Sequence, residues 1–220
     1  MLEGDAIFED RKQTFEGSGI NFYKYEAIAY NITGDTAVKS VNSFEELGLW
    51  PLVLDNLKKQ QDALTPAMTA PATQEALILS PTRELAIQIR NEANMCANGS
   101  TVKTQVNYGG TAIFPQKQRL MKGCNILVAT TGRLKQFISE KIVDVSEVRY
   151  FILDEADRMF DMGFMPDVDT VVESLPPKKE RVSGMFSDTF SPDIQAAAKN
   201  ILGDYIYIVI VVGGACADVK

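Results

Sequence analysis

The chain has 220 residues, a length that suits one α/β domain or one domain with a tail. Hydrophobic residues make up 45% and charged residues 23% of the chain, which is ordinary for a globular protein and excludes a wholly disordered one. The formal net charge of −7 excludes a generally basic coat for nucleic acid, so any nucleic-acid surface must be a local patch.

Several other classes are excluded by residue content. The chain contains no histidine, which removes histidine-dependent catalysis and the usual Cys/His zinc sites. Its three cysteines, Cys96, Cys124 and Cys216, form no CxxC pair and are interpreted as ordinary reduced thiols. The longest apolar run, 205–212, is too short to span a membrane, and the acidic start is unlike a signal peptide. We expect a cytoplasmic protein without a membrane partner.

The first part of the chain gives weak signals. Residues 1–42 are polar and interrupted by glycine, and we interpret them as a loosely attached N-terminal extension. The sequence pattern changes at 43–46, where Ser-Phe-Glu-Glu has the form of a helix capping box. Residues 65–73 are rich in Ala, Thr and Pro without a period and are predicted to form a loop.

From residue 76 onward, short apolar runs alternate with amphipathic segments. Helices are predicted where apolar residues fall on one face, over 85–96, around 134–138, and over 192–202 between the cap Ser191 and the stop Gly203. Strands are predicted at 76–80, 104–108, 126–129, 150–153, 184–187 and 206–212. This alternation predicts a parallel sheet with helices on both faces.

Polar residues follow almost every predicted strand. In open α/β sheets the active site lies beyond the carboxyl ends of the strands, so these positions are the candidates for chemistry. The residues concerned are Pro81, Thr82, Arg83, Gly109, Gly110, Thr130, Gly132, Arg133, Asp154, Glu155 and Asp157, with Ser187 and Thr189 after the sixth run. Helix N-termini, glycine turns and arginine forks are suited to phosphates, although each also suits a plain cap or turn.

The pair Asp154-Glu155 follows the apolar strand 150–153. A carboxylate in this position can hold Mg²⁺ through water, and its neighbour can orient or deprotonate an attacking water. The alternative is a solvated acidic start of a helix, where carboxylates are favourable in any case.

Five segments in a fixed order give a specific signal: SPTREL at 80–85, GG at 109–110, TTGRL at 130–134, LDEADRM at 153–159 and FSDTF at 186–190. Together they resemble the DEAD-box family of ATP-dependent RNA helicases, over roughly 43–212. GINFYKYE at 19–26 and SFEELGL at 43–49 are similar to the Vasa-type branch. The resemblance implies a RecA-like first lobe, so the expected division is an extension at 1–42, the helicase ATP-binding domain at 43–212 and a tail at 213–220.

The resemblance also implies roles for individual residues. Asp154 matches the carboxylate that faces Mg²⁺, and Glu155 matches the catalytic base of ATP hydrolysis. Phe44 matches the aromatic residue that packs on adenine, with a role in a hydrophobic staple or core as the alternative. Asp157, Ser187 and Thr189 match groups that couple hydrolysis to RNA binding. Backbone contacts to RNA, independent of base sequence, are implied for Pro81, Thr82, Arg83, Gly109, Gly110, Thr130, Gly132 and Arg133.

The chain departs from the family pattern in three places. The phosphate-loop pattern GxxxxGK[ST] does not occur, and only the 16 residues 60–75 separate Lys59 from Ala76, where the family carries that loop and its strand. Thr131 replaces a proline of the family pattern. Asp188 replaces an alanine, and its charge is expected to raise the pKa of neighbouring carboxylates and to repel ATP.

We therefore expect a sheet without its central phosphate-loop strand. The strand at 206–212 is then predicted either to stay unpaired or to pair with 184–189, at a cost in stability. We expect this chain to lack the family's second lobe, to keep part of the RNA surface and to lack ATPase activity. Two alternatives stay open: a non-enzymatic decoy that binds RNA or partners, and a splicing or gene-prediction product without stable function.

Overall fold

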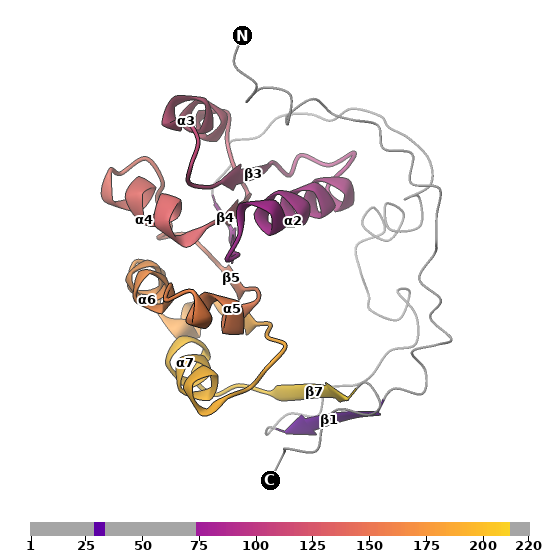
Figure 1. Cartoon of the computed structure of the whole chain (residues 1–220). Coiled ribbons are helices and arrows are strands. Elements are labelled where there is room, and N and C mark those ends of the chain that lie inside the picture. Colours follow the sequence, from indigo (N-terminus) through magenta and orange to yellow (C-terminus); the bar gives the residue numbers. More distant parts are fainter. Residues whose placement is uncertain (1–28, 34–73, 212–220) are drawn as a thin grey trace.

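The computed structural model describes residues 29–33 and 74–211 (Figure 1). Five strands form one parallel sheet: β2 (Ala76–Leu79), β3 (Thr104–Asn107), β4 (Ile126–Ala129), β5 (Tyr150–Leu153) and β6 (Val182–Met185). Their order across the sheet is β3-β4-β2-β5-β6, and every pairing is parallel. This confirms the predicted fold class, with β6 beginning two residues earlier than expected.

Helices lie on both faces of this sheet, as predicted. They are α2 (Arg83–Cys96), α3 (Ile113–Met121), α4 (Thr131–Ser139), α5 (Ala156–Asp161), α6 (Met165–Glu173) and α7 (Pro192–Leu202), with a short 3-10 turn at Lys178–Glu180. Figure 1 shows α2 on one side of the strands, and α4 and α6 on the other. Within the described residues, no helix has the length and hydropathy that crossing a bilayer requires.

The core is divided by the alternation of side chains along the strands. Leu77, Leu127 and Phe151 share one row of the register and face a large cluster that includes residues of α4, α5, α6 and α7. The next row, with Ile78 and Val128, faces a smaller cluster beneath α2. Because successive strand residues point to opposite faces, the continuous apolar runs of the sequence supply both clusters.

Side-chain caps mark the starts of two of the predicted helices, α2 and α7. The hydroxyl of Thr82 accepts a hydrogen bond from the N–H of Leu85 at 3.3 Å, which fixes the start of α2. The hydroxyl of Ser191 accepts one from the N–H of Ile194 at 3.3 Å, and α7 ends at Gly203, which has φ +84°. Helices α3 and α6 were not predicted from the sequence, and α5 was foreseen only by the alternative that the acidic pair starts a helix.

The last strand pairs differently from either prediction. Strand β7 (Tyr207–Val211) runs antiparallel to β1 (Ala29–Thr33), with Tyr207 opposite Thr33 and Val211 opposite Ala29. Strand β1 lies within the segment 1–42, for which no strand was predicted. Because β1 supplies hydrogen-bond partners for its main chain, β7 is neither unpaired nor paired with β6. The expected elements at 43–46 and 65–73 lie outside the described residues.

Candidate nucleic-acid interface

The carboxyl ends of β2, β3 and β4 meet at one edge of the sheet, where α2 and α4 begin. Between them lies an open cavity of 410 Å³. Its walls come from the turns after three strands and from the first turns of α4 and α6. They are formed by Pro81, Arg83, Gly109, Thr130, Thr131, Gly132, Arg133, Gln136, Phe164 and Asp167. Six of the eight predicted RNA-contact residues are thus brought together, whereas Thr82 and Gly110 do not line this cavity.

Arg133 is one of two arginines that line this cavity. Its residue is only 8% exposed, and its Nη2 donates to the carbonyl oxygen of Thr111 at 2.9 Å. Its Nη1 is buried without a hydrogen-bond partner in the structure, and the guanidinium lies 5.5 Å from the centre of the Phe137 ring. A buried donor of a cation without an acceptor is costly, so Nη1 is a candidate donor to an anionic group at this cavity.

The N-terminus of α4 adds a second source of positive potential at the same place. The side chain of its cap residue, Thr130, makes no capping hydrogen bond, and no acidic residue lies in the first turn. The main-chain N–H groups at the start of the helix therefore carry the positive end of the helix dipole toward the cavity. An uncapped helix start next to an unsatisfied arginine is a suitable arrangement for a phosphate group.

A buried glutamine that the sequence analysis missed supports the turn at 109–112. Gln116 of α3 is 1% exposed, and its Oε1 accepts from the N–H of Tyr108 at 3.1 Å. Its Nε2 donates to the carbonyl of Tyr108 at 3.0 Å and to the hydroxyl of Thr111 at 2.9 Å. Gly110 has φ +76°, which glycine adopts without strain. The amide of Gln116 thereby holds the turn that Arg133 contacts through Thr111.

The residues before α2 have separate tasks. Thr82 is used as the N-cap of α2, through its hydroxyl. Arg83 is exposed, pairs with Glu84 at 3.1 Å and lies 5.9 Å from the centre of the Tyr108 ring. An exposed ion pair is worth little, so Arg83 can exchange Glu84 for a phosphate at small cost.

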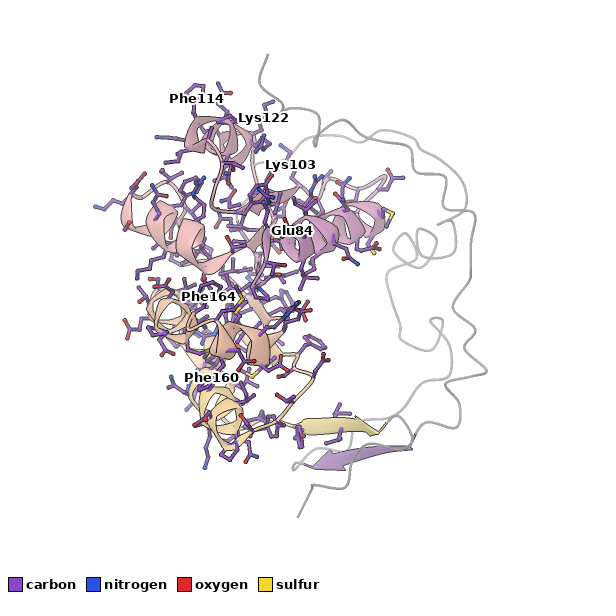
Figure 2. The ribbon with its side chains drawn as sticks, viewed as in Figure 1. Glu84, Lys103, Phe114, Lys122, Phe160 and Phe164 are labelled. Carbon is purple, nitrogen blue, oxygen red and sulfur yellow. The ribbon has the colours of Figure 1, made fainter. Side chains whose placement is uncertain are left out.

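Two side chains of the cavity wall come from an unpredicted helix. Phe164, labelled in Figure 2, is the N-cap residue of α6, and Asp167 lies in its first turn. The Nζ of Lys135 on α4 contacts the Oδ1 of Asp167 at 2.5 Å, which neutralises that carboxylate. No sequence signal indicated these residues, because their place in the cavity depends on how α6 packs against α4.

A separate acidic cluster follows β5. The carboxylate of Asp154 accepts from the N–H of Glu155 at 3.1 Å. Partial burial raises the pKa of Asp154 above its usual value; the hydrogen bond from Glu155 opposes this, and the charges of Glu155 and Asp188 add to the rise. This direction agrees with the effect expected of the Asp188 charge on its neighbours. Glu155 adopts a left-handed backbone (φ +49°) and its carboxylate binds the guanidinium of Arg158 at 2.7 Å.

The three predicted coupling residues are joined by hydrogen bonds. The carboxylate of Asp157 accepts from the N–H of Thr189 at 3.0 Å and from its hydroxyl at 3.2 Å. The hydroxyl of Ser187 accepts from the N–H of Asp157 at 3.2 Å. Burial raises the pKa of Asp157, but hydrogen bonds from Arg158, Thr189 and Ser187 outweigh it and hold the pKa below its usual value. The start of α5 is thereby attached to the segment after β6.

The acidic cluster does not fit a nucleotide with Mg²⁺. Among the described residues, no group of three or more carboxylate, cysteine or histidine side chains converges on one point, and the carboxylate of Glu155 binds Arg158. Mg²⁺ bound by one or two carboxylates takes further oxygens from a phosphate group. The loop that would hold such phosphates is missing from the sequence, and Phe44 lies outside the described residues. Within the described residues, Asp154 and Glu155 thus stand without a group that would hold the phosphates of a nucleotide.

The chain was compared with curated proteins. It is 33% identical over 246 aligned positions to the ATP-dependent RNA helicase vasa of Drosophila melanogaster, covering 92% of this chain and 37% of that protein. It is 32% identical to the probable ATP-dependent RNA helicase DDX4 of Homo sapiens, covering 92% of this chain and 35% of that protein. The chain thus spans just over a third of these relatives. The alignments are longer than the chain itself, so they contain positions that this chain lacks.

Two solved structures share the fold. A DEAD box protein from the hyperthermophile Methanococcus jannaschii is 42% identical with a TM-score of 0.56, over 60% of this chain and 36% of that one. The yeast DEAD-box splicing factor Prp28 is 29% identical with a TM-score of 0.59, over 73% and 38%. The family profile of the DEAD/DEAH box helicases matches residues 49–197, inside the predicted domain 43–212, whose limits remain a prediction. The chain belongs to the DEAD/DEAH box helicase family and is similar to its Vasa and DDX4 members.

Proposed function

We propose that this helicase domain binds the sugar–phosphate backbone of RNA weakly and without nucleotide. The observation that supports this most directly is the buried, unpartnered Nη1 of Arg133 beside the uncapped start of α4. A phosphate in the 410 Å³ cavity would accept from both. Neither group distinguishes one base from another, so binding is expected to be independent of sequence. We further propose that the protein acts in the cytoplasm.

The test is binding of a fluorescent single-stranded RNA by fluorescence anisotropy. Contacts to two or three phosphates lower the affinity about tenfold between roughly 50 mM and 200 mM salt. Arg83→Ala and Arg133→Ala are each expected to weaken binding and to flatten this salt dependence. Arg149→Ala is the matched control, because it removes one exposed arginine from the opposite end of the sheet, just before β5.

Because Arg133 is buried, its loss also affects folding, so thermal unfolding of each variant is recorded alongside. Arg83 is exposed and its replacement leaves the core intact, which keeps the test decisive. RNA binding that responds equally to Arg83→Ala and Arg149→Ala would show that the RNA surface lies elsewhere.

We propose also that the chain does not hydrolyse ATP. The phosphate-loop pattern is missing from the sequence, and its main-chain cradle and lysine are the chief ligands of the triphosphate in proteins of this kind. Isothermal titration with ATP and Mg²⁺ is expected to show no binding, with or without RNA. Phosphate release that exceeds the release by a Glu155→Gln variant would contradict this part of the proposal.

A further inference from the structure

Among the described strands, β6 lies at one edge of the five-stranded sheet. The N–H groups of Val182 and Phe186 donate to carbonyl oxygens of β5 residues or their neighbours, at 2.7 Å and 2.9 Å. Because alternate residues of a strand direct their main-chain groups to opposite sides, those of Ser183 and Met185 point away from β5. Within the described part of the chain they have no main-chain partner, since β6 pairs with β5 alone.

The free edge of β6 lacks the features that normally prevent pairing. Natural edge strands carry charged residues, proline or bulges. The segment 182–186, Val-Ser-Gly-Met-Phe, has none of these, and Val182 and Phe186 are 62% and 60% exposed. The other edge strand, β3, begins Thr-Gln at 104–105, next to Lys103. The two edges of the sheet therefore differ, and only β6 presents an apolar edge.

An exposed apolar face continues from this edge across the sheet. Val182 lies opposite Tyr150 in the register, and Tyr150 is 52% exposed. The next row pairs Gly184 with Ile152, and the ring of Phe186 lies beside Gly184. Helix α2 covers the same face of the sheet mainly over β3 and β4, and its cluster reaches Ile78 of β2. The edge and this face together form a surface that suits another strand and its side chains.

The two ends of β6 carry opposite charges, basic before the strand and acidic after it. Just before the strand, the exposed Lys178 and Lys179 outnumber Glu180, whereas Arg181 is buried. Just after it, the exposed Asp188 lies close enough to Asp154 to affect its pKa. In an antiparallel pair of two β6 strands related by a twofold axis, the basic end of each strand lies beside the acidic end of the other. A parallel pair would place like charges together.

We propose that two copies of this chain pair antiparallel through their β6 edges, so that one sheet continues across the dimer. The free groups of Ser183 and Met185 then gain partners in both copies at once, and Val182 and Phe186 are buried against the second copy. This dimer surface is separate from the cavity around Arg133, so its test does not depend on RNA binding.

The test is sedimentation velocity of the full chain over a wide range of concentration. The wild-type chain is expected to shift from monomer to dimer as concentration rises. Val182→Lys places a charge where the pairing buries an apolar side chain against the second copy, and Ser183→Pro removes an outward N–H without removing a hydrogen bond to β5, so both should remain monomeric. Two controls should dimerise normally: Met121→Lys, at a residue of α3 that is 80% exposed, and Ser183→Ala, which loses only the hydroxyl contact with Arg181.

Hydrogen exchange provides a second readout that does not depend on any variant. The amides of Ser183 and Met185 should become protected as concentration rises, whereas those of Val182 and Phe186 should not change, because they are already bonded toward β5. A wild-type chain that stays monomeric at every concentration would overturn the proposal. So would open-ended aggregates that form equally with Val182→Lys, or a dimer in which the Ser183 and Met185 amides stay unprotected.

Discussion

The carboxylate of Asp157 accepts two hydrogen bonds from Thr189, a residue 32 positions later in the chain. One comes from the main-chain N–H at 3.0 Å and the other from the hydroxyl at 3.2 Å. This contact joins the start of α5 to the segment between β6 and α7. The same hydrogen bonds help to hold the pKa of Asp157 below its usual value.

Thr189→Val is expected to destabilise the fold by about 0.5–1.5 kcal/mol, the usual net value of one hydrogen bond. The pKa of Asp157 is lowered in the folded chain, so its ionised form stabilises the fold above the unfolded pKa of 3.8, and this contribution is lost as pH falls through the folded value. Urea unfolding at a series of pH values should show the difference between Asp157→Asn and the wild type shrinking below about pH 4. A difference that stays constant with pH would contradict the assignment.

Asp188 is expected to act on Asp154 through its charge. Burial is the main reason that the pKa of Asp154 is raised, and the charges of Glu155 and Asp188 add to it. Asp188→Ala should therefore lower the midpoint at which Asp154 titrates, measured by NMR of the carboxyl carbon. Asp193→Ala, on the first turn of α7, serves as a control for the loss of one negative charge.

The contribution of Asp154 to stability changes with pH in the opposite direction to that of Asp157. A carboxyl with a raised folded pKa favours the fold while it is protonated, and this contribution is lost as pH rises from the unfolded value of 3.8 through the folded one. Asp154→Asn keeps an oxygen that accepts from the N–H of Glu155 but removes the charge. It should therefore be more stable than the wild type at neutral pH and lose this advantage in acid. A variant that is less stable at neutral pH would show that burial of this charge is not costly here.

Gln116 is expected to control both stability and the shape of the RNA cavity. Gln116→Leu leaves the N–H and the carbonyl of Tyr108 without their buried partner, at a cost of about 1–3 kcal/mol. The turn at 109–112 loses its support, so RNA affinity should fall although Gln116 does not line the cavity. Gln118→Leu on the exposed side of α3 is the matched control for stability and binding. If Gln118→Leu is as harmful in both measurements, the buried amide has no special role.

Local patterns predicted those parts of the fold that depend on neighbours in the sequence. The apolar run of β4 and the caps Ser191 and Gly203 of α7 are local signals. They allowed this strand and this helix to be predicted from the sequence alone. The five motifs at strand ends could be brought to one edge because parallel strands end together. Helix α6 was missed because its β-branched Val168, Val171 and Val172 do not favour a helix by themselves, and packing against α4 decides its conformation.

Long-range pairings could not be predicted. An apolar strand such as β7 needs hydrogen-bond partners, but its sequence does not specify which strand supplies them. The pairing with β1 and the burial of Gln116 against the turn after β3 both depend on contacts between distant segments. The unpartnered Nη1 of Arg133 could be identified only once the carbonyl of Thr111 was seen to occupy Nη2.

Cys124 offers a probe of global unfolding. The residue is 2% exposed, and burial raises the pKa of its thiol to about 12. Since the thiolate is the reactive form, Cys124 should resist a maleimide or a disulfide reagent at pH 8 until the chain unfolds. A variant with Cys96→Ser and Cys216→Ser isolates this thiol. Labelling as fast as that of the urea-unfolded chain would mean that the core around Cys124 opens readily.

The last prediction concerns the pair β1–β7, which stands apart from the five-stranded sheet. Two strands without further pairing are marginal in water, so their amides should exchange faster than those of β5, which is paired on both sides. Asn31→Pro removes an N–H at the centre of β1, opposite Val209, and should abolish protection in β7 while leaving β5 unchanged. Asn31→Ala, which keeps the N–H, should leave β7 protected. If β7 proves as slow to exchange as β5 and is unaffected by Asn31→Pro, then it is stabilised by a partner other than β1.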